Sequence, residues 1–377
     1  MSLGEVKIGL LLPTTGVDSA QGTDTTKGFE LYLNKLGGRA GGRKMRILNE
    51  NDEAKPDLAL TKIKKLIEGD GVDFVVGPIS SAVALAIRDY VHERGTPLLV
   101  PAAFTRLLTS PQQASPNILR LSETSDQANY PMGAWLMKNT EYRKVIIMAA
   151  DFAGGRHSVE AFMAGFRAAG GEIAGEAYPP FGTTDFVPYL REISPIQADA
   201  VYAWFAGADA VHFVKQYKQY RRDKPLPLTG HSALTADTIL PAIGDAALGI
   251  VTVGAYSASL ETRENAEFVQ DYDAAHKTWP SRYSECGWSA AALIASALDT
   301  LKGDLSDRSR VRNELRNALP KIKPPRGPMQ FDAYGQAISP IYITRTDKVA
   351  ERFVNTVIDR IPAVSQAATW GWWNKSS

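Results

Sequence analysis

Ile8-Gly9-Leu10-Leu11-Leu12 and Val145-Ile146-Ile147-Met148 are short apolar runs, and each opens a longer stretch of the same pattern. The first stretch extends from Lys7 to about Val91 and the second from Lys144 to about Tyr217. Each run leads through a Gly-containing loop into an amphipathic helix, followed by a second run, a second helix and a third run introduced by an Asp. Short strands that alternate with helices are typical of a parallel sheet with crossover helices. The repeat therefore predicts an α/β fold with two doubly wound parallel-sheet lobes.

The length of the chain agrees with two lobes. A chain of 377 residues is expected to form two domains of roughly 150–200 residues each. In doubly wound sheets, ligands bind outside the carboxyl ends of the strands. Two lobes built alike can face each other and close on one ligand.

Composition and charge exclude several classes of partner. The chain is 44% hydrophobic and 22% charged with a formal net charge of +1, which argues against a nucleic-acid partner. Cys286 is the single cysteine, so the chain has no intrachain disulfide and no cysteine metal cluster. No run approaches the roughly 18 apolar residues of a membrane span. Met1-Ser2-Leu3 followed at once by a strand is typical of an expression start that replaces a removed leader.

Apolar periodicity and turn residues predict the individual elements. In the first lobe we expect strands Lys7–Leu12, Lys44–Asn51, Phe74–Val76 and Leu98–Val100, and helices Gln21–Leu36, Asp57–Glu68 and Ala82–Arg94. In the second lobe we expect strands Lys144–Ala149, Glu172–Tyr178, Val201–Trp204 and Ile250–Val253, and helices Arg156–Ala169, Phe186–Ile193 and Asp209–Tyr220. Helices Asn265–Lys277 and Glu285–Leu301 return to the first lobe, and Met329–Phe331 pairs with Ile338–Thr344 before a last strand, Val354–Ile358.

A set of short motifs occurs in a recognisable order. It consists of Ile8–Gly16, Gly28 with Glu30, Val75–Pro78 with Ser80 and Ser81, Pro101-Ala102-Ala103, and Gly327-Pro328-Met329-Gln330-Phe331-Asp332. In this order and at these spacings, the chain resembles type I periplasmic binding proteins of the branched-chain amino acid (Leu/Ile/Val) group, the receptors of ABC importers. The resemblance covers nearly the whole sequence.

The resemblance implies a fold, a location and partners. It implies two lobes joined by three hinge crossings, with residues 1–122 and 255–328 in the N-terminal lobe and residues 123–254 and 329–377 in the C-terminal lobe and hinge strands. It also implies a small ligand held in the interlobe cleft, an ABC transporter membrane permease as partner, a periplasmic location, no cofactor and no chemistry on the ligand.

Departures from the family pattern affect the expected ligand. Ala54 and Ser80 stand where leucine-binding members carry a disulfide, and His231 stands where amino-acid binders carry a carboxylate for the ligand ammonium. The tyrosine that closes over the amino acid falls on Gly154, and a threonine is replaced by Phe104. A buried ammonium without an anionic partner is costly. These changes favour a ligand other than an α-amino acid.

Candidate ligand contacts of the first lobe follow its strands. Ser80 and Ser81 lie where a strand ends and a helix begins, and a helix start offers free N–H groups to a carboxylate. The alternative is that both serines only cap the helix. Ala102, Ala103 and Phe104 follow the next strand, where they would offer backbone groups and a ring face.

Candidate contacts of the second lobe repeat this geometry. Phe152–Arg156, with Gly154 and Arg156, follow one strand. Trp204–Gly207, with Phe205, follow another, and His231 follows a third. His231 could donate to a carboxylate, or it could be a satisfied structural histidine. From the returning region, Tyr283, Cys286 and Trp288 lie near where the family places a cleft wall. Trp288 is equally consistent with the core.

We therefore expect a solute receptor that is not an enzyme. The chain has no Gly-x-Ser-x-Gly elbow and no Gly-x-Gly-x-x-Gly after a strand, and its five histidines lack zinc-ligand spacing. The favoured ligand is a benzoate- or nicotinate-like aromatic carboxylate, with rings such as Phe104, Trp204 and Trp288 around its own ring. A branched-chain amino acid, an amide or urea is the alternative ligand, and a cytoplasmic amide-type ligand-sensing regulator is the alternative class.

Overall fold

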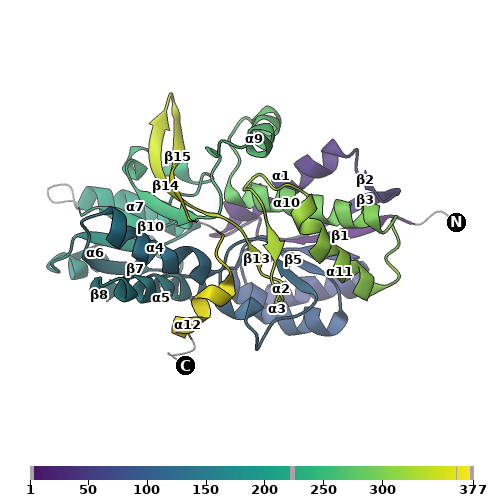
Figure 1. The fold of residues 1–377 in the computed structure, drawn as a ribbon, viewed down its shortest axis with the longest axis horizontal. Coiled ribbons are helices and arrows are strands. Elements are labelled where there is room, and N and C mark those ends of the chain that lie inside the picture. Colours follow the sequence, from purple (N-terminus) through teal and green to yellow (C-terminus); the bar gives the residue numbers. More distant parts are fainter. Residues whose placement is uncertain (1–3, 221–225, 362, 374–377) are drawn as a thin grey trace. The chain divides into compact units, whose positions relative to one another are not determined.

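Two sheets organise the chain, one in each of two units (Figure 1). The computed structural model describes residues 4–220, 226–361 and 363–373. The first unit comprises Met1–Glu123 and Glu261–Ser339, and the second comprises Thr124–Leu260 and Pro340–Ser377. The chain thus passes from one unit to the other at three places.

The first sheet is parallel except at one edge. Its strand order is β2-β3-β1-β4-β5-β6, and only β2 runs antiparallel to its neighbour. The strands are β1 (Val6–Leu11), β2 (Arg39–Ala40), β3 (Arg43–Glu50), β4 (Phe74–Val76), β5 (Leu98–Val100) and β6 (Ile118–Arg120). Every residue of β4 and β5 is buried, as expected for central strands covered on both faces.

Helices cover both faces of this sheet. They are α1 (Ser19–Lys35), α2 (Pro56–Lys64) with a π-helical turn (Lys65–Gly69), α3 (Ser81–Arg94), α9 (Arg263–His276), α10 (Arg282–Thr300) and α11 (Arg308–Ala318). Apolar residues of α2 and α3 form one core cluster with β4, β5 and β6. Figure 1 shows α1 and α10 on the other face.

The packing of α1 on α10 depends on two glycines. A Cβ built on Gly28 of α1 would overlap the backbone oxygen of Ser284, and one built on Gly287 of α10 would overlap that of Thr25. Backbone approach this close is possible only where there is no side chain. The crossing therefore fixes where the first turn of α10 lies against the sheet.

The second sheet has a parallel centre and an antiparallel edge. Its order is β15-β14-β11-β10-β9-β7-β8, in which β14 and β15 are antiparallel. The strands are β7 (Lys144–Ala149), β8 (Glu172–Ala177), β9 (Ala200–Trp204), β10 (Leu228–His231), β11 (Val251–Gly254), β14 (Ile341–Val349) and β15 (Arg352–Ile361). The long β14–β15 pair is drawn in yellow in Figure 1.

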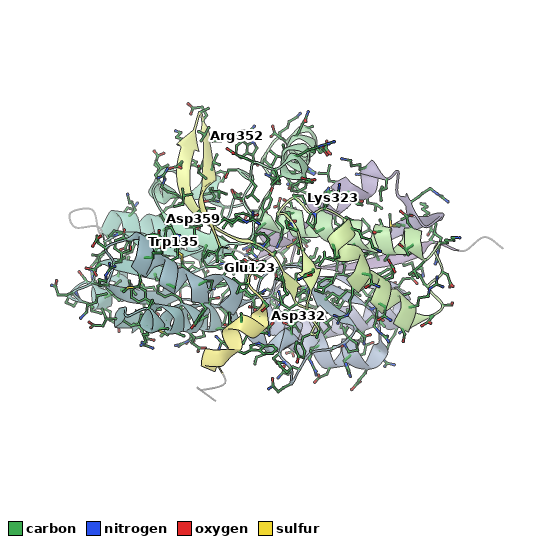
Figure 2. The ribbon with its side chains drawn as sticks, viewed as in Figure 1. Glu123, Trp135, Lys323, Asp332, Arg352 and Asp359 are labelled. Atoms are coloured by element: carbon green, nitrogen blue, oxygen red, sulfur yellow. The ribbon has the colours of Figure 1, made fainter. Side chains whose placement is uncertain are left out.

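Helices of the second unit are joined to its sheet by aromatic and polar contacts. The helices are α4 (Ser125–Asn139), α5 (Ala153–Ala168), α6 (Val187–Ile193), α7 (Gly207–Tyr220), α8 (Leu240–Ile243) and α12 (Trp370–Trp373). Phe162 of α5 stacks on Tyr202 of β9 with ring centroids 3.5 Å apart. Trp135 of α4 donates through Nε1 to Asp359 of β15 at 2.6 Å, and both side chains are labelled in Figure 2.

The sequence-based element assignment agrees with much of this order and misses part of it. Strands β4, β5 and β7 have the predicted bounds. Helix α4 was not expected, since Pro131 lies inside it and proline normally interrupts a helix. The predicted pairing of Met329–Phe331 with Ile338–Thr344 is confirmed only in part, where Gln330 lies opposite Ile338. Only β13 (Ala337–Ile338) pairs with β12 (Gln330–Phe331), and β14 starts after Pro340 in the other sheet.

The division into units also differs from the sequence-based division. The structure places 255–260 with the second unit and 329–339 with the first. The second placement has a clear cause, because Gln336 accepts from Arg120 Nε at 2.6 Å and donates to Ser122 O at 2.7 Å. These bonds hold the β12–β13 pair against the end of β6.

Gly28→Ala is expected to destabilise the first unit by about 1–3 kcal/mol, because the added methyl group forces α1 away from α10. Urea unfolding followed by circular dichroism would show the loss as a lower transition midpoint. Gly4→Ala is the matched control, since no atom lies within 4 Å of a Cβ at that position. Equal midpoints for both variants would contradict the close packing of this crossing.

Candidate ligand-binding site

Ser80 and Ser81 lie where β4 leads into α3. Ser80 is the N-cap residue with φ −73° and ψ 133°, yet its side chain makes no capping hydrogen bond. The Ser81 hydroxyl instead accepts from the backbone N–H of Thr105 at 3.2 Å. The two hydroxyls therefore do not act as simple helix caps in the structure. Ser81 joins the start of α3 to the loop that follows β5.

That loop is fixed by backbone and guanidinium contacts. Ala103 has a left-handed φ of 62° and donates to Ile79 O at 2.9 Å. The fully buried Arg120 donates through Nη1 to Ala103 O and Thr105 O, both at 2.6 Å. Ala102 O accepts from the Ser122 hydroxyl at 3.1 Å. These bonds lie on both sides of Phe104 and hold its backbone in place.

A second arginine, Arg282, lies against the Phe104 ring. The guanidinium carbon of Arg282 lies 4.4 Å from the ring centroid of Phe104. Arg282 Nη2 also donates to Glu123 Oε2 at 2.7 Å, and both side chains are at most 4% exposed. Figure 2 labels Glu123, which is the last residue before the first crossing. A buried cation thus stands beside the loop that carries Ala102, Ala103 and Phe104.

Arg282 is a residue that the sequence reasoning missed. The predicted helix started at Glu285, whereas α10 starts at Arg282 after the N-cap Ser281. Ser281 and Ser284 form a reciprocal capping box, and this Ser-x-x-Ser pattern before an apolar run was the available signal. With the correct start, Arg282 becomes the first residue of a buried helix.

Two other candidates of the first unit have different surroundings. Cys286 Sγ accepts from Arg326 Nη2 at 2.7 Å, and burial raises the pKa of this thiol to about 12. The Trp288 ring meets Tyr32 of α1 edge-on at 4.7 Å and Phe268 of α9 at 6.0 Å. The structure places Cys286 against a buried guanidinium and Trp288 against neighbouring helices.

In the second unit, Trp204 and His231 end adjacent strands. Their rings lie 6.3 Å apart, and Phe152, just before α5, contacts Trp204 at 5.3 Å. His231 Nδ1 accepts from the Ala233 N–H at 3.1 Å. Because Nδ1 is the acceptor, the neutral ring carries its proton on Nε2 and presents a donor there. Phe152 opens the stretch Phe152–Arg156, and the structure adds its ring to this cluster.

The remaining candidates of the second unit lie apart from this pair. Phe205 packs against Phe213 at 4.4 Å and Phe186 at 5.1 Å, in the core under α6 and α7. Gly154 is buried in the first turn of α5, where its carbonyl accepts from Ser158 at 2.7 Å.

Arg156 is already engaged within its own unit. Its Nε donates to Asp151 Oδ1 at 2.7 Å, and its guanidinium lies 3.4 Å from the Tyr178 ring centroid. The hydrogen bond from Arg156 lowers the pKa of the exposed Asp151 carboxyl. A ligand contact by Arg156 would have to compete with both partners.

The described residues contain neither a candidate membrane span nor a candidate metal site. No helix in this part of the chain has the length and apolar character of a membrane span. No cluster of three or more His, Cys, Asp and Glu side chains there has a metal-binding arrangement.

Comparisons with known proteins define the class. The family described as periplasmic binding protein matches residues 5–351. A Leu/Ile/Val-binding protein homolog 6 from Brucella melitensis biotype 1 is 28% identical over 269 residues, which is 71% of this chain and 68% of that protein. The chain belongs to the type I periplasmic binding proteins, in the branched-chain amino acid ABC transporter family.

Solved structures agree with this assignment. A solute-binding protein of an ABC transporter from R. palustris, in complex with benzoate, is 30% identical with a TM-score of 0.90 and covers 96% of this chain and 98% of its own. Another from Rhodopseudomonas palustris BisB5, in complex with 3,4-dihydroxybenzoic acid, is 29% identical with a TM-score of 0.89 and covers 96% and 98%. This chain is accordingly a solute-binding protein of an ABC transporter, a class of receptors that act outside the cytoplasm with a membrane permease.

A pH dependence of stability follows from Asp209, at the start of α7. Its Oδ2 accepts from Gly182 N–H at 2.9 Å, and burial raises its pKa to about 6. Because the folded-state pKa lies above the unfolded value, protonation stabilises the fold below about pH 4, and that stability is lost as the pH rises through about 6. Asp209→Asn should therefore gain in melting temperature relative to wild type as the pH rises from about 4 to 7.

Asp347→Asn provides a control of opposite sign in the same unit. Its pKa is lowered by the hydrogen bond from Arg345, so wild-type stability is present above the unfolded pKa and is lost as the pH falls. This variant should lose in relative melting temperature as the pH rises through about 4. If both variants showed the same pH trend, the assignment of opposite pKa shifts to Asp209 and Asp347 would be refuted.

Proposed function

We propose that this protein is the periplasmic receptor of an ABC importer and that it binds a small aromatic carboxylate, such as a benzoate-like acid, between its two units. The observation that carries the proposal is the first-unit edge where the start of α3, the Ser80 and Ser81 hydroxyls and the Phe104 loop come together. Helix N–H groups and hydroxyls suit a carboxylate, and Phe104 offers a face to a ring. Two similar solved proteins, at 30% and 29% identity, hold benzoate and 3,4-dihydroxybenzoic acid.

The second unit supplies the other half of the proposed site. Trp204 offers an aromatic surface, and His231 offers a donor at Nε2. Gly154 has no side chain at its position in the first turn of α5. We include Ser80, Ser81, Ala102, Ala103 and Phe104 of the first unit and Gly154, Arg156, Trp204 and His231 of the second. Phe205, Cys286 and Trp288 stay predictions from sequence, and their contacts do not favour them.

Ligand binding would act by closing the units. A ligand shifts such an equilibrium only by as much as its affinity differs between the open and the closed form. Contacts made by both units with one small molecule supply that difference, and hinge closure around a ligand is an established mode of change. The permease would then recognise the closed form.

Wild-type protein is expected to bind benzoate or 4-hydroxybenzoate more tightly than leucine or benzamide. The physical reason is that helix N–H groups and hydroxyls prefer a charged carboxylate, whereas no carboxylate stands at His231 to pair with an ammonium. Thermal-shift screening followed by calorimetry would rank the ligands, and small-angle scattering would show a smaller radius of gyration on binding.

Other outcomes identify the alternatives. Strong stabilisation by leucine with none by benzoates would favour an amino-acid receptor, in line with the name of the Brucella relative. Binding of amides alone would favour an amide receptor or an amide-sensing regulator. Turnover of a bound compound would refute the receptor role.

Trp204→Leu is expected to weaken benzoate binding about tenfold, since a ring contact contributes about 0.5–1.5 kcal/mol beyond burial. Trp288→Leu should leave the affinity unchanged, because its ring packs on Tyr32 and Phe268. Calorimetric titration of both variants, after circular dichroism has confirmed folding, would compare them. A larger loss for Trp288→Leu would reverse the two roles.

A further inference from the structure

We propose that Arg282 binds the ligand's carboxylate directly, through an unpaired nitrogen of its guanidinium. This inference rests on the proposed function for the site, but not on the aromatic nature of the ligand. It places the group that binds the carboxylate in the first turn of α10. This segment is neither the end of a strand nor a glycine-rich loop.

The first step is the hydrogen bonding of Arg282. The residue is 3% exposed, and of its nitrogens only Nη2 donates, to Glu123. Nε and Nη1 are buried and have no hydrogen-bond partner among the described residues. An arginine carries five N–H donors, and buried polar groups in folded proteins are almost always paired. Unused donors on a buried cation therefore indicate a missing acceptor.

The second step is the orientation of the guanidinium. Glu123 holds it at Nη2, and the Phe104 ring lies against it at 4.4 Å, with the Tyr283 ring at 5.4 Å. A planar guanidinium held by a carboxylate and a ring face has little rotational freedom left to lose on binding. The unpaired Nε–H and Nη1–H groups point to opposite sides of the guanidinium, so each is pre-oriented for one acceptor oxygen, and an oxygen of a carboxylate fits either.

The third step is location. Phe104 is followed by Thr105, whose N–H donates to Ser81 at the start of α3. Arg282, the α3 N-terminus and the Ser81 hydroxyl therefore belong to one cluster. Arg120 adds a second buried guanidinium through its bonds to Ala103 O and Thr105 O.

The unused hydrogen-bond donors of the cluster, rather than its net charge, favour an anion over a cation. Glu123 neutralises Arg282, and Asp18 and Glu123 both act electrostatically on the buried Tyr283 hydroxyl, whose pKa is raised chiefly by burial. Helix N–H groups and unused guanidinium donors are all donors, so they can satisfy an anion but not an ammonium. The class of ligand is therefore a carboxylate whose oxygens reach Arg282.

The test compares an acid with its neutral isostere. Arg282→Gln should weaken benzoate binding by about 10- to 100-fold, because hydrogen bonds to a charged group are lost. Benzamide binding should change little, so the ratio of the two affinities falls. Arg263→Gln, an exposed arginine of the same unit that pairs with Glu267, is the matched control and should leave both affinities unchanged.

A second variant distinguishes loss of the Arg282 contact from misfolding. Arg282→Gln leaves Glu123 buried without its partner, so the double variant Glu123→Gln/Arg282→Gln removes both charges together. It should fold as judged by circular dichroism and show the same fall in the benzoate-to-benzamide ratio. A folded double variant with the wild-type ratio would overturn the proposal.

Failure of the proposed function is distinguishable from failure of this inference. If wild type binds leucine or an aliphatic acid and no aromatic acid, the aromatic assignment fails and the same variants are titrated with the acid that binds. Loss of that affinity in Arg282→Gln supports the Arg282 contact, and unchanged affinity overturns it. If the wild type binds no carboxylate at all, both proposals are overturned.

Discussion

Buried guanidiniums hold the part of the first unit where the chain changes units. Arg120 at the end of β6 bonds Ala103, Thr105 and Gln336. Arg326 is fully buried, pairs with Glu285 of α10 and donates to Leu121 O. Together with the pairing of Arg282 and Glu123, these contacts join segments far apart in the sequence, all close to a crossing. An arginine can do this because its fork of donors reaches several acceptors at once.

Such pairs are a constraint rather than a source of large net stability. Removing one partner of a buried ion pair typically costs about 3–5 kcal/mol, although an apolar replacement of both is often neutral. In this protein, the buried ion pairs fix the positions of the segments that they join. The crossing of α1 on α10 at Gly28 and Gly287 sets the place of the first α10 turn, and the guanidinium contacts then align that turn with the Phe104 loop. The candidate site is therefore a product of contacts outside it.

The sequence predicts the parts of this arrangement that local patterns encode. Runs such as Phe74–Val76 and Leu98–Val100 are apolar throughout, so their bounds are visible without a structure. Helix α4 was missed because Pro131 argues against a helix, and α11 because its charged residues hide the apolar stripe. The Ser-x-x-Ser capping pattern could have placed Arg282 on the helix, but its pairing with Glu123, 159 residues away, follows from no local rule. The contacts of Phe205 and Trp288, which depend on tertiary packing, were equally beyond a local pattern.

On the proposed function, the hydrogen-bonding groups of both units favour a negatively charged ligand. In the second unit, His231 uses Nδ1 to cap its own loop, which leaves a neutral ring with a donor rather than a carboxylate. In the first unit, a helix start and a buried guanidinium add donors. On the proposed function, a carboxylate would satisfy the unused donors of Arg282, whereas an ammonium cannot pair with a donor. On the proposed function, one fold can thus serve acids or amino acids, and the choice depends on a few positions at the carboxyl ends of its strands.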